Sequence, residues 1–190
     1  AVAAALRRVT PEGCFSIKMR SGFHCPAELP ELLARLCRAA RPDAVTVHYR
    51  TALEGYRAAP GRLERLCGAA AAARRYGFRL IVNGDLATAA ETLALMAQTG
   101  AAGAMIGRGF WRDPALLRRL EGSSDRLAPE AARQQLWTAI LEAGRACPRG
   151  SFTRGKAVEL AHLIAGRDSD DARELRTLSA DGFRRWLAAH

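Results

Sequence analysis

The chain has 190 residues, of which 49% are hydrophobic, and its formal net charge at pH 7 is +10. This length suits one or two domains, and the apolar content excludes a largely disordered chain. No apolar run of about 18 residues or more occurs, which argues against a membrane-spanning helix.

The positive charge comes almost entirely from arginine, because Lys18 and Lys156 are the lysines of the sequence. An excess of arginine favours a partner that carries phosphate groups. The cysteines are odd in number and form no CxxC pair, which argues against a zinc site and a disulfide framework. We therefore expect a protein of the reducing cytoplasm, without a metal and without a membrane partner. The chain begins at Ala1 rather than Met, and we interpret this start as a cut inside a longer protein.

Short strands alternate with helices along the first two thirds of the sequence. The apolar and β-branched runs predict strands at Cys14–Met19, Ala44–Val47, Leu80–Val82 and Ala104–Ile106. Helical spacing predicts helices at Leu29–Ala40, Leu63–Tyr76 and Thr88–Thr99, and a further helix opened by Asp113 and Pro114. This order predicts parallel strands joined by right-handed crossovers, either half of a (β/α)8 barrel or a doubly wound sheet.

The pattern changes near residue 122. Gly122–Ser124 is typical of a linker, and helices are predicted at Pro129–Gly144, Phe152–Ile164, Ala172–Leu178 and Asp181–Ala189. No strand signal occurs in this part of the sequence. We therefore predict a partial barrel of four strand-helix units over residues 1–121 and a helical domain over residues 122–190.

Polar triplets follow the predicted strands at their carboxyl ends. They are Lys18-Met19-Arg20, His48-Tyr49-Arg50, Asn83-Gly84-Asp85 and Gly107-Arg108-Gly109. Barrel enzymes build their active sites at this end of the sheet, so the triplets favour the barrel over the doubly wound sheet. We predict that they converge around one cavity the size of a flavin.

Each triplet suggests a chemical role and a plainer alternative. The glycines around Arg108 would let backbone amides approach a phosphate, with Asn83-Gly84-Asp85 as the partner loop, although both could be ordinary tight turns. Lys18 points away from its apolar neighbours, where a cation would favour a reduced flavin, or it could lie at the rim with its charge in water. His48 could donate a hydrogen bond to a flavin, or it could be a core histidine with its bonds satisfied.

Four stretches resemble the tRNA-dihydrouridine synthases, in that family's order and at about its spacing. They are Ile17–Phe23, Val45–Thr51, Val82–Asp85 and Met105–Gly109. The likeness is strong over most of Phe15–Leu120 and weak in the helical tail. The stretch Gly55-Tyr56-Arg57-Ala58 is most similar to the bacterial C-type subfamily.

The resemblance implies an FMN-dependent enzyme that uses NADPH to reduce a uridine of the tRNA D-loop to dihydrouridine. By that resemblance Lys18 and His48 would contact the flavin ring, while Asn83, Gly84, Asp85, Gly107 and Arg108 would hold the phosphate region. Arg50 and Tyr56 would lie near the substrate tRNA. The full-length enzyme is expected to be a monomer.

The sequence departs from the family's pattern in two respects. Tyr49 stands where the family has a small residue or proline, so it could narrow the mouth of the site or stack on a base. The family's catalytic cysteine, in an Asn-x-Gly-Cys-Pro-like loop, has no counterpart here, and neither Cys14 nor Cys25 takes that role. We expect that cysteine upstream of this chain, and we expect this chain alone to be inactive.

The stretch from Arg145 to Lys156 has four basic residues and no acidic ones. Arg154 and Lys156 resemble the pair by which the family's helical domain holds tRNA backbone, although a solvated charged loop would explain them too. Two other functions stay open from the sequence. One is an FMN barrel with a small-molecule substrate, such as a dihydroorotate or enoate reductase, and the other is an RNA-binding remnant without catalysis.

Overall fold

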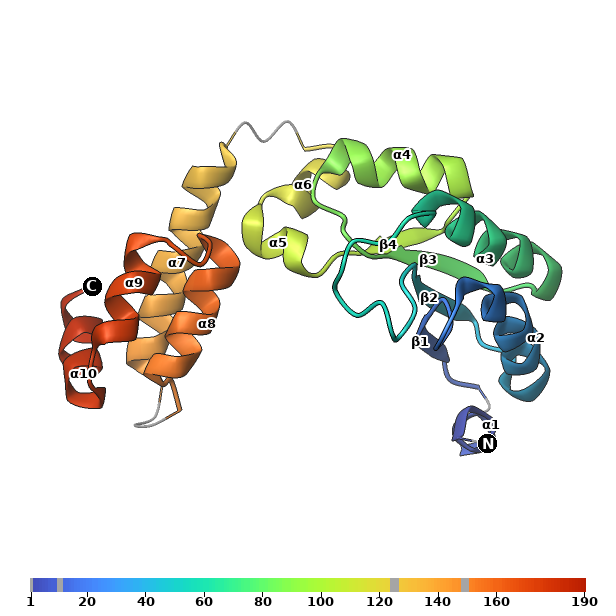
Figure 1. Ribbon diagram of the computed structural model, residues 1–190, viewed down its shortest axis with the longest axis horizontal. Coiled ribbons are helices and arrows are strands. Elements are labelled where there is room, and N and C mark those ends of the chain that lie inside the picture. The colour runs from blue at the N-terminus through green and yellow to red at the C-terminus, as the bar shows by residue number, and fades with distance from the viewer. Residues whose placement is uncertain (1, 10–11, 124–126, 148–150) are drawn as a thin grey trace. The chain divides into compact units, whose positions relative to one another are not determined.

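The computed structural model describes residues 2–9, 12–123, 127–147 and 151–190 (Figure 1). The chain forms two compact units, and each is described by itself. The first unit comprises Ala1–Leu86 and Ala90–Ile106, and the second comprises Ala87–Ala89 and Gly107–His190.

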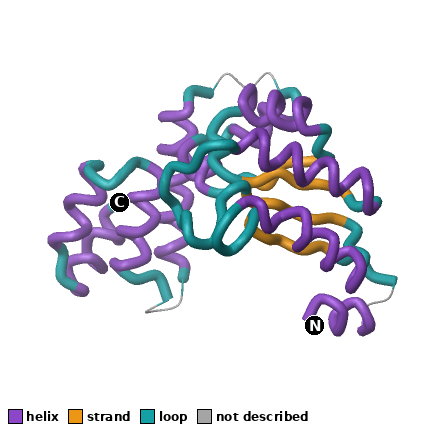
Figure 2. Tube along the Cα trace, turned by 45° about the vertical axis from the view of Figure 1, so that its right-hand side comes forward, coloured by secondary structure: helices purple, strands orange, loops and turns teal. Residues whose placement is uncertain are grey.

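The first unit contains a sheet of four parallel strands in chain order. The strands are β1 (Ser16–Arg20), β2 (Ala44–His48), β3 (Arg79–Asn83) and β4 (Gly103–Met105). The crossover helices α2 (Leu29–Ala40), α3 (Arg62–Tyr76) and α4 (Ala89–Thr99) lie along one face of it (Figures 1 and 2). The predicted alternation of parallel strands and helices is thus confirmed, with element ends that differ by a few residues.

Alternation along the strands decides which residues face the helices. Val45 and Val47 of β2 are fully buried in the core, and Leu80 and Val82 of β3 stand beside them in register. The helices contribute buried residues to the same core, namely Leu33 and Cys37 of α2, Leu66, Ala69 and Ala70 of α3, and Leu95 of α4. The alternate residues of each strand therefore face the opposite side of the sheet.

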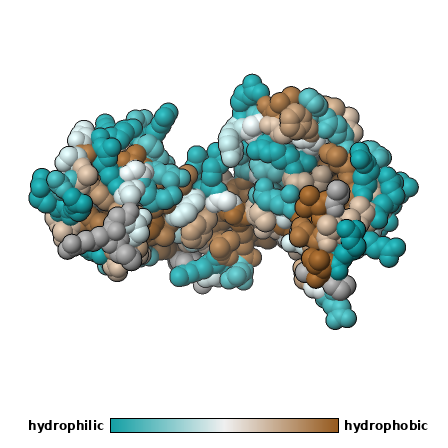
Figure 3. Space-filling view, turned by 90° about the horizontal axis from the view of Figure 1, so that it is seen from below, coloured by the Kyte–Doolittle hydropathy of each residue, from teal (hydrophilic) through white to brown (hydrophobic). Residues whose placement is uncertain are grey.

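Two short helices lie outside the predicted pattern. Helix α1 (Val2–Val9) precedes β1, and the single 3-10 turn η1 (Pro26–Glu28) precedes α2. Arg7 of α1 donates to the backbone carbonyls of Ala40 and Arg41, which ties α1 to the end of α2. The large apolar residues of α1 are exposed, and Figure 3 shows that apolar atoms reach the molecular surface in several places.

The regular secondary structure of the second unit consists of helices in the part of the chain that the structure describes. Its helices are α5 (Arg108–Arg112), α6 (Leu116–Leu120), α7 (Pro129–Ala146), α8 (Arg154–Ile164), α9 (Asp170–Thr177) and α10 (Ala180–Ala189). Helices α8, α9 and α10 begin after a Thr or Ser whose side chain accepts a backbone N–H of the first turn. The core of α7–α10 contains Leu141, Ala157, Ala161, Ala172, Leu175, Phe183, Trp186 and Leu187.

Two features between β4 and α7 differ from the predictions. A short helix, α5, follows Gly107 directly, where the sequence predicted only a turn. The next helix, α6, has Ala115 rather than Asp113 at its N-cap, because the Asp113 carboxylate accepts from the Ala115 N–H and pairs with Arg119. The compact units divide at Ile106 and Gly107, and the predicted domain boundary after residue 121 stays a prediction. Within the described ranges, no helix is both long and apolar enough to cross a membrane.

Candidate active site

The carboxyl ends of β1, β2 and β3 bring polar side chains to one edge of the sheet. Arg20, His48 and Asn83 are partners in register across these strands, so they lie side by side on the face turned away from the helices. Lys18 shares that face, two residues earlier on β1 and level with Thr46. The structure therefore brings Lys18, His48 and Asn83 to one face of the sheet, with His48 and Asn83 at its carboxyl edge and Lys18 two residues before that edge.

His48 is held as a neutral hydrogen-bond donor. Its Nδ1 accepts the backbone N–H of Arg50 at 3.1 Å, so the proton of the neutral ring resides on Nε2. Burial lowers the pKa of His48 to about 4, and the positive charges of Arg20, Lys18 and Arg50 act in the same direction. At neutral pH the ring therefore offers one N–H, from Nε2, and no positive charge.

Tyr49 and Arg50 turn back into the protein and meet Asp85, in the turn after β3. The Tyr49 hydroxyl donates to Asp85 Oδ2 at 2.7 Å, and Arg50 Nη1 donates to Oδ1 at 3.1 Å. A second Arg50 nitrogen pairs with Oδ2, so the contact is bidentate. Only 5% of the Arg50 side chain is exposed, which places it inside the protein rather than at the surface where a substrate would arrive.

The turn Asn83-Gly84-Asp85 is shaped around the Tyr49 ring. Gly84 has a φ of 115°, and a Cβ atom there would lie 2.7 Å from Cδ1 of Tyr49. Asn83 is buried, and its Nδ2 donates to the carbonyl of Met105 at 2.6 Å, which joins β3 to the end of β4. These contacts show why the turn needs glycine, and the predicted contacts of the three residues with a cofactor stay predictions.

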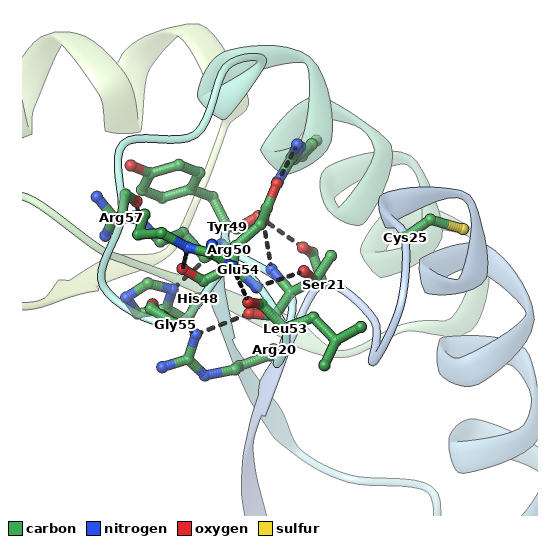
Figure 4. Close-up of polar contacts among 12 residues, drawn as sticks. Arg20, Ser21, Cys25, His48, Tyr49, Arg50, Leu53, Glu54, Gly55 and Arg57 are labelled. Atoms are coloured by element: carbon green, nitrogen blue, oxygen red, sulfur yellow. Dashed lines mark hydrogen bonds and ion pairs between the residues drawn. The ribbon is translucent and has the colours of Figure 1, made fainter.

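The loop of residues 51–61, which follows β2, lies beside this edge and presents Tyr56. The Tyr56 residue is 74% exposed, and the Arg20 guanidinium lies 5.8 Å from the centre of its ring. Arg20 also donates to the carbonyls of Thr51 at 2.8 Å and Gly55 at 3.0 Å, which fixes the first half of the loop (Figure 4). Tyr56 is therefore displayed on an ordered loop, as a tRNA-contacting residue would need to be.

Glu54 connects the same loop to α3. Its carboxylate accepts from two nitrogens of Arg65, at 2.8 and 2.9 Å, and from the backbone N–H of Thr51 at 2.7 Å. The bonds from Arg65 lower the pKa of Glu54 to about 2, with a further contribution from the Thr51 N–H. Sequence reasoning missed Glu54 and Arg65, although the Thr51-x-x-Glu54 spacing is typical of a capping turn.

The remaining predicted residues belong to the second unit. Gly107 immediately precedes α5, and Arg108 is the first residue of that helix. Arg154 and Lys156 are exposed in the first turn of α8, where Arg154 donates to the carbonyls of Arg176 and Leu178 and Lys156 pairs with Glu159. Their predicted contacts, with a phosphate and with tRNA respectively, stay predictions.

The cysteines do not complete the site. Cys14 lies before the first residue of β1, at the amino edge, and Cys25 belongs to the segment before α2, where Figure 4 shows its side chain well away from His48 and Arg50. Cys37 is buried, and burial raises the pKa of its thiol. In the described part of the chain, His, Cys, Asp and Glu form no group of three that could hold a metal ion.

The sequence is similar to that of known proteins over most of its length. The sequence profile of the dihydrouridine synthase family matches residues 2–148, which is most of the chain. The tRNA-dihydrouridine(16) synthase of Haemophilus ducreyi is 30% identical over 140 residues, which cover 70% of this chain and 40% of that protein. The chain thus spans well under half of the relative that it matches. It belongs to the dihydrouridine synthase family.

Proposed function

We propose that the protein carrying this chain reduces a uridine of the tRNA D-loop to 5,6-dihydrouridine, with FMN as cofactor and NADPH as hydride source. We also propose that the four strands are part of a (β/α)8 barrel and that the second unit includes a helical tRNA-binding domain. The observation that carries the proposal is that Lys18, His48 and Asn83 share one face of the sheet near its carboxyl edge, in a chain of this family.

The side chains at this edge fit the chemistry of a flavin. A flavin's pyrimidine edge presents carbonyl oxygens and gains negative charge on reduction, and Lys18 and the Nε2–H of His48 offer a cation and a neutral donor on the same face. When bound, FMN would supply the hydride for the uracil ring. The chain's own residues would bind and orient it, with Asn83 and Gly84, and also Gly107 and Arg108, proposed around the phosphate region. No residue of this chain is assigned the proton transfer to uracil.

The alternative of an FMN barrel with a small-molecule substrate loses support, because the family match extends over residues 2–148. The relative's name places its uridine at position 16 of tRNA. We propose the same position as the first one to examine, since the two proteins align over 140 residues.

The decisive experiment is to map dihydrouridine in tRNA from a strain that lacks the complete gene. Loss of dihydrouridine at a D-loop position, restored by the wild-type gene, would support the function. An unchanged dihydrouridine pattern would contradict it.

The cofactor is tested separately on the purified full-length protein. It should carry FMN, and Lys18→Ala, His48→Ala and Arg108→Ala should each weaken FMN binding measured by flavin fluorescence. Glu159→Gln is a suitable control, because Glu159 makes only an exposed pair with Lys156 among the contacts described. FMN binding that none of the three changes alters would remove these residues from the cofactor site.

The proposed RNA contacts of the second unit are tested by salt dependence. Each phosphate contact contributes to the slope of binding affinity against salt concentration. Replacing both Arg154 and Lys156 with Ala should weaken tRNA binding and flatten that slope. Because Arg154 also bonds to the end of α9, the single change Lys156→Ala serves as the structurally mild variant. An unchanged slope in both variants would reject the role.

A further inference from the structure

The carboxylate of Asp85 connects two loops at the carboxyl edge of the sheet. Asp85 lies in the turn after β3, whereas Tyr49 and Arg50, whose side chains donate to it, lie directly after β2. The Arg50 guanidinium also lies 4.7 Å from the centre of the Tyr49 ring. The three side chains therefore form one cluster in which a buried cation is bonded on one side and stacked on another.

Arg50 extends this cluster into the 51–61 loop. Its Nε donates to the carbonyl of Arg57 at 2.6 Å, directly after the exposed Tyr56. The route of contacts thus runs from Asp85 through Arg50 to the peptide bond that follows Arg57. The Arg50 side chain is only 5% exposed, and three of its five N–H groups are bonded within the protein, so burial keeps its guanidinium away from an RNA phosphate.

We propose that Asp85 is a positioning residue, which acts through Arg50 to hold the 51–61 loop and its Tyr56 ring in place for RNA. Asp85 and Arg50 touch neither RNA nor cofactor in this proposal. RNA as the partner of the loop rests on the proposed function, whereas the clamp between the two loops does not. This assignment replaces the roles that the family resemblance implied for both residues.

The backbone at Asp85 allows a clean test of its carboxylate. Asp85 has a φ of 51°, in the left-handed region that aspartate and asparagine adopt more readily than most other residues with a side chain. The change Asp85→Asn therefore keeps the turn and the side-chain shape, and it removes the negative charge and one acceptor of the bidentate contact. Arg50→Lys is the second variant, because lysine keeps the positive charge and loses the planar donor pair and the bond to Arg57.

The first measurement is the rate at which trypsin cuts the native full-length protein after Arg57. Arg57 is exposed, and its carbonyl is the acceptor of the Arg50 bond, so this peptide bond reports directly on the clamp. Cleavage of a native loop follows the population of its open form. We expect Asp85→Asn and Arg50→Lys each to raise the cleavage rate after Arg57 about tenfold or more.

The matched control is Asp43→Asn. Asp43 pairs with Arg7 at 3.0 Å, and its side chain is 43% exposed compared with 34% for Asp85, but Asp43 lies directly before β2, at the opposite end of that strand from the loops. We expect the control to leave cleavage after Arg57 unchanged. Equal cleavage in Asp85→Asn, Arg50→Lys and the wild type would overturn the proposal.

The second measurement separates positioning from direct contact. If Asp85 positions the loop, Asp85→Asn should raise the KM for tRNA about tenfold, with FMN affinity and kcat at saturating tRNA nearly unchanged. A loss of FMN affinity without faster cleavage after Arg57 would overturn the proposal and return Asp85 to the cofactor site. Faster cleavage in a protein that does not reduce tRNA would retain the clamp and contradict the proposed function instead.

Discussion

Two regions of the molecule were predicted to contact tRNA through an arginine, and the burial and the bonding partners of these two arginines differ. Arg50, at the carboxyl edge of the sheet in the first unit, is 4% exposed and bonded to a carboxylate and a backbone carbonyl. Arg154, at the start of α8 in the second unit, is exposed and donates to two backbone carbonyls near the end of α9.

This difference concerns what surrounds each arginine rather than its chemistry. At the carboxyl edge, the Tyr49 ring, the Asp85 carboxylate and the Arg57 carbonyl contact the guanidinium of Arg50, so this side chain connects two loops of the protein. No carboxylate is described beside Arg154. Its partners are backbone carbonyls near the end of α9, which attract a cation but do not neutralise its positive charge. An arginine therefore connects two loops inside the protein in the first region, whereas the arginine of the second region is exposed and accessible to a polyanion.

The largest difference in stability between the two regions is expected when a glycine of each region is replaced with alanine. Gly84→Ala would place a methyl group 2.7 Å from the Tyr49 ring at a φ of 115°, and we expect a loss of about 3 kcal/mol in the free energy of unfolding. Gly155, in the first turn of α8, would place its Cβ no closer than 3.9 Å to Thr153 Oγ1. Gly155→Ala should therefore be neutral or stabilise by up to about 0.5 kcal/mol.

Urea unfolding of both variants, followed by circular dichroism, measures these values. A loss below about 1 kcal/mol for Gly84→Ala would mean that the Tyr49 ring moves aside and that the edge is not tightly packed.

The second prediction compares the arginines themselves. Arg50→Ala removes the partner of Asp85 and leaves the Arg57 carbonyl without its donor, so we expect a loss of about 2 kcal/mol in the free energy of unfolding. This figure allows for the partial exposure of Asp85, at 34% of its side chain. Arg154→Ala should cost about 0.5 kcal/mol, because water can solvate the carbonyls that it leaves.

The same urea titration at neutral pH checks both arginine variants. Equal losses of unfolding free energy for Arg50→Ala and Arg154→Ala would mean that the two arginines contribute alike to stability, which would contradict the proposed difference between the regions.

Much of the first unit could be predicted from sequence, because its signals are local. The β-branched run at Ala44–Val47 and the helical spacing of Leu29–Ala40 depend on neighbours within one element, and both predictions agree with the structure. The shared edge of His48 and Asn83, with Lys18 two residues before it on the same face, followed from the rule that parallel strands end on the same side.

The cluster of Tyr49, Arg50 and Asp85 could not be predicted in the same way. Its residues are separated by 35 and 36 positions, and the contact depends on the rotation of two loops about a glycine. Tyr49 stood out in the sequence as a departure from the family's pattern, and a role in narrowing the site or stacking on a base was expected. The structure shows instead that its ring packs on Gly84 and its hydroxyl bonds to Asp85.

The third prediction concerns the loss of stability at acidic pH when Glu54 is protonated. Glu54 has a pKa of about 2 in the folded protein, below its usual value of 4.5, because Arg65 and the Thr51 N–H favour the carboxylate. The stabilisation is therefore complete above about pH 4.5 and is lost as the pH falls toward 2. The side chain is 26% exposed, so we expect a contribution of about 1 kcal/mol.

Unfolding measured between pH 6 and pH 3 should show this dependence in the wild type and a flatter one in Glu54→Gln. Glu159→Gln in the second region is the control, because the Glu159–Lys156 pair is more than half exposed on both sides. Identical pH profiles for the wild type and Glu54→Gln would show that the loop does not depend on this carboxylate.

The smallest effect tests the electrostatics of the first region at His48. Burial is the main cause of its low pKa, and the charges of Arg20, Lys18 and Arg50 add to it. Lys18→Ala removes one of these charges, so the pKa of His48 should rise from about 4 and still remain below the usual 6.5. An NMR titration of the ring Cε1–H, assigned with a His48→Asn variant, measures both pKa values. A wild-type His48 that titrates near 6.5 would mean that the ring is solvated, and the ring would then become positively charged at mildly acidic pH and lose the Nδ1 acceptor for the Arg50 N–H.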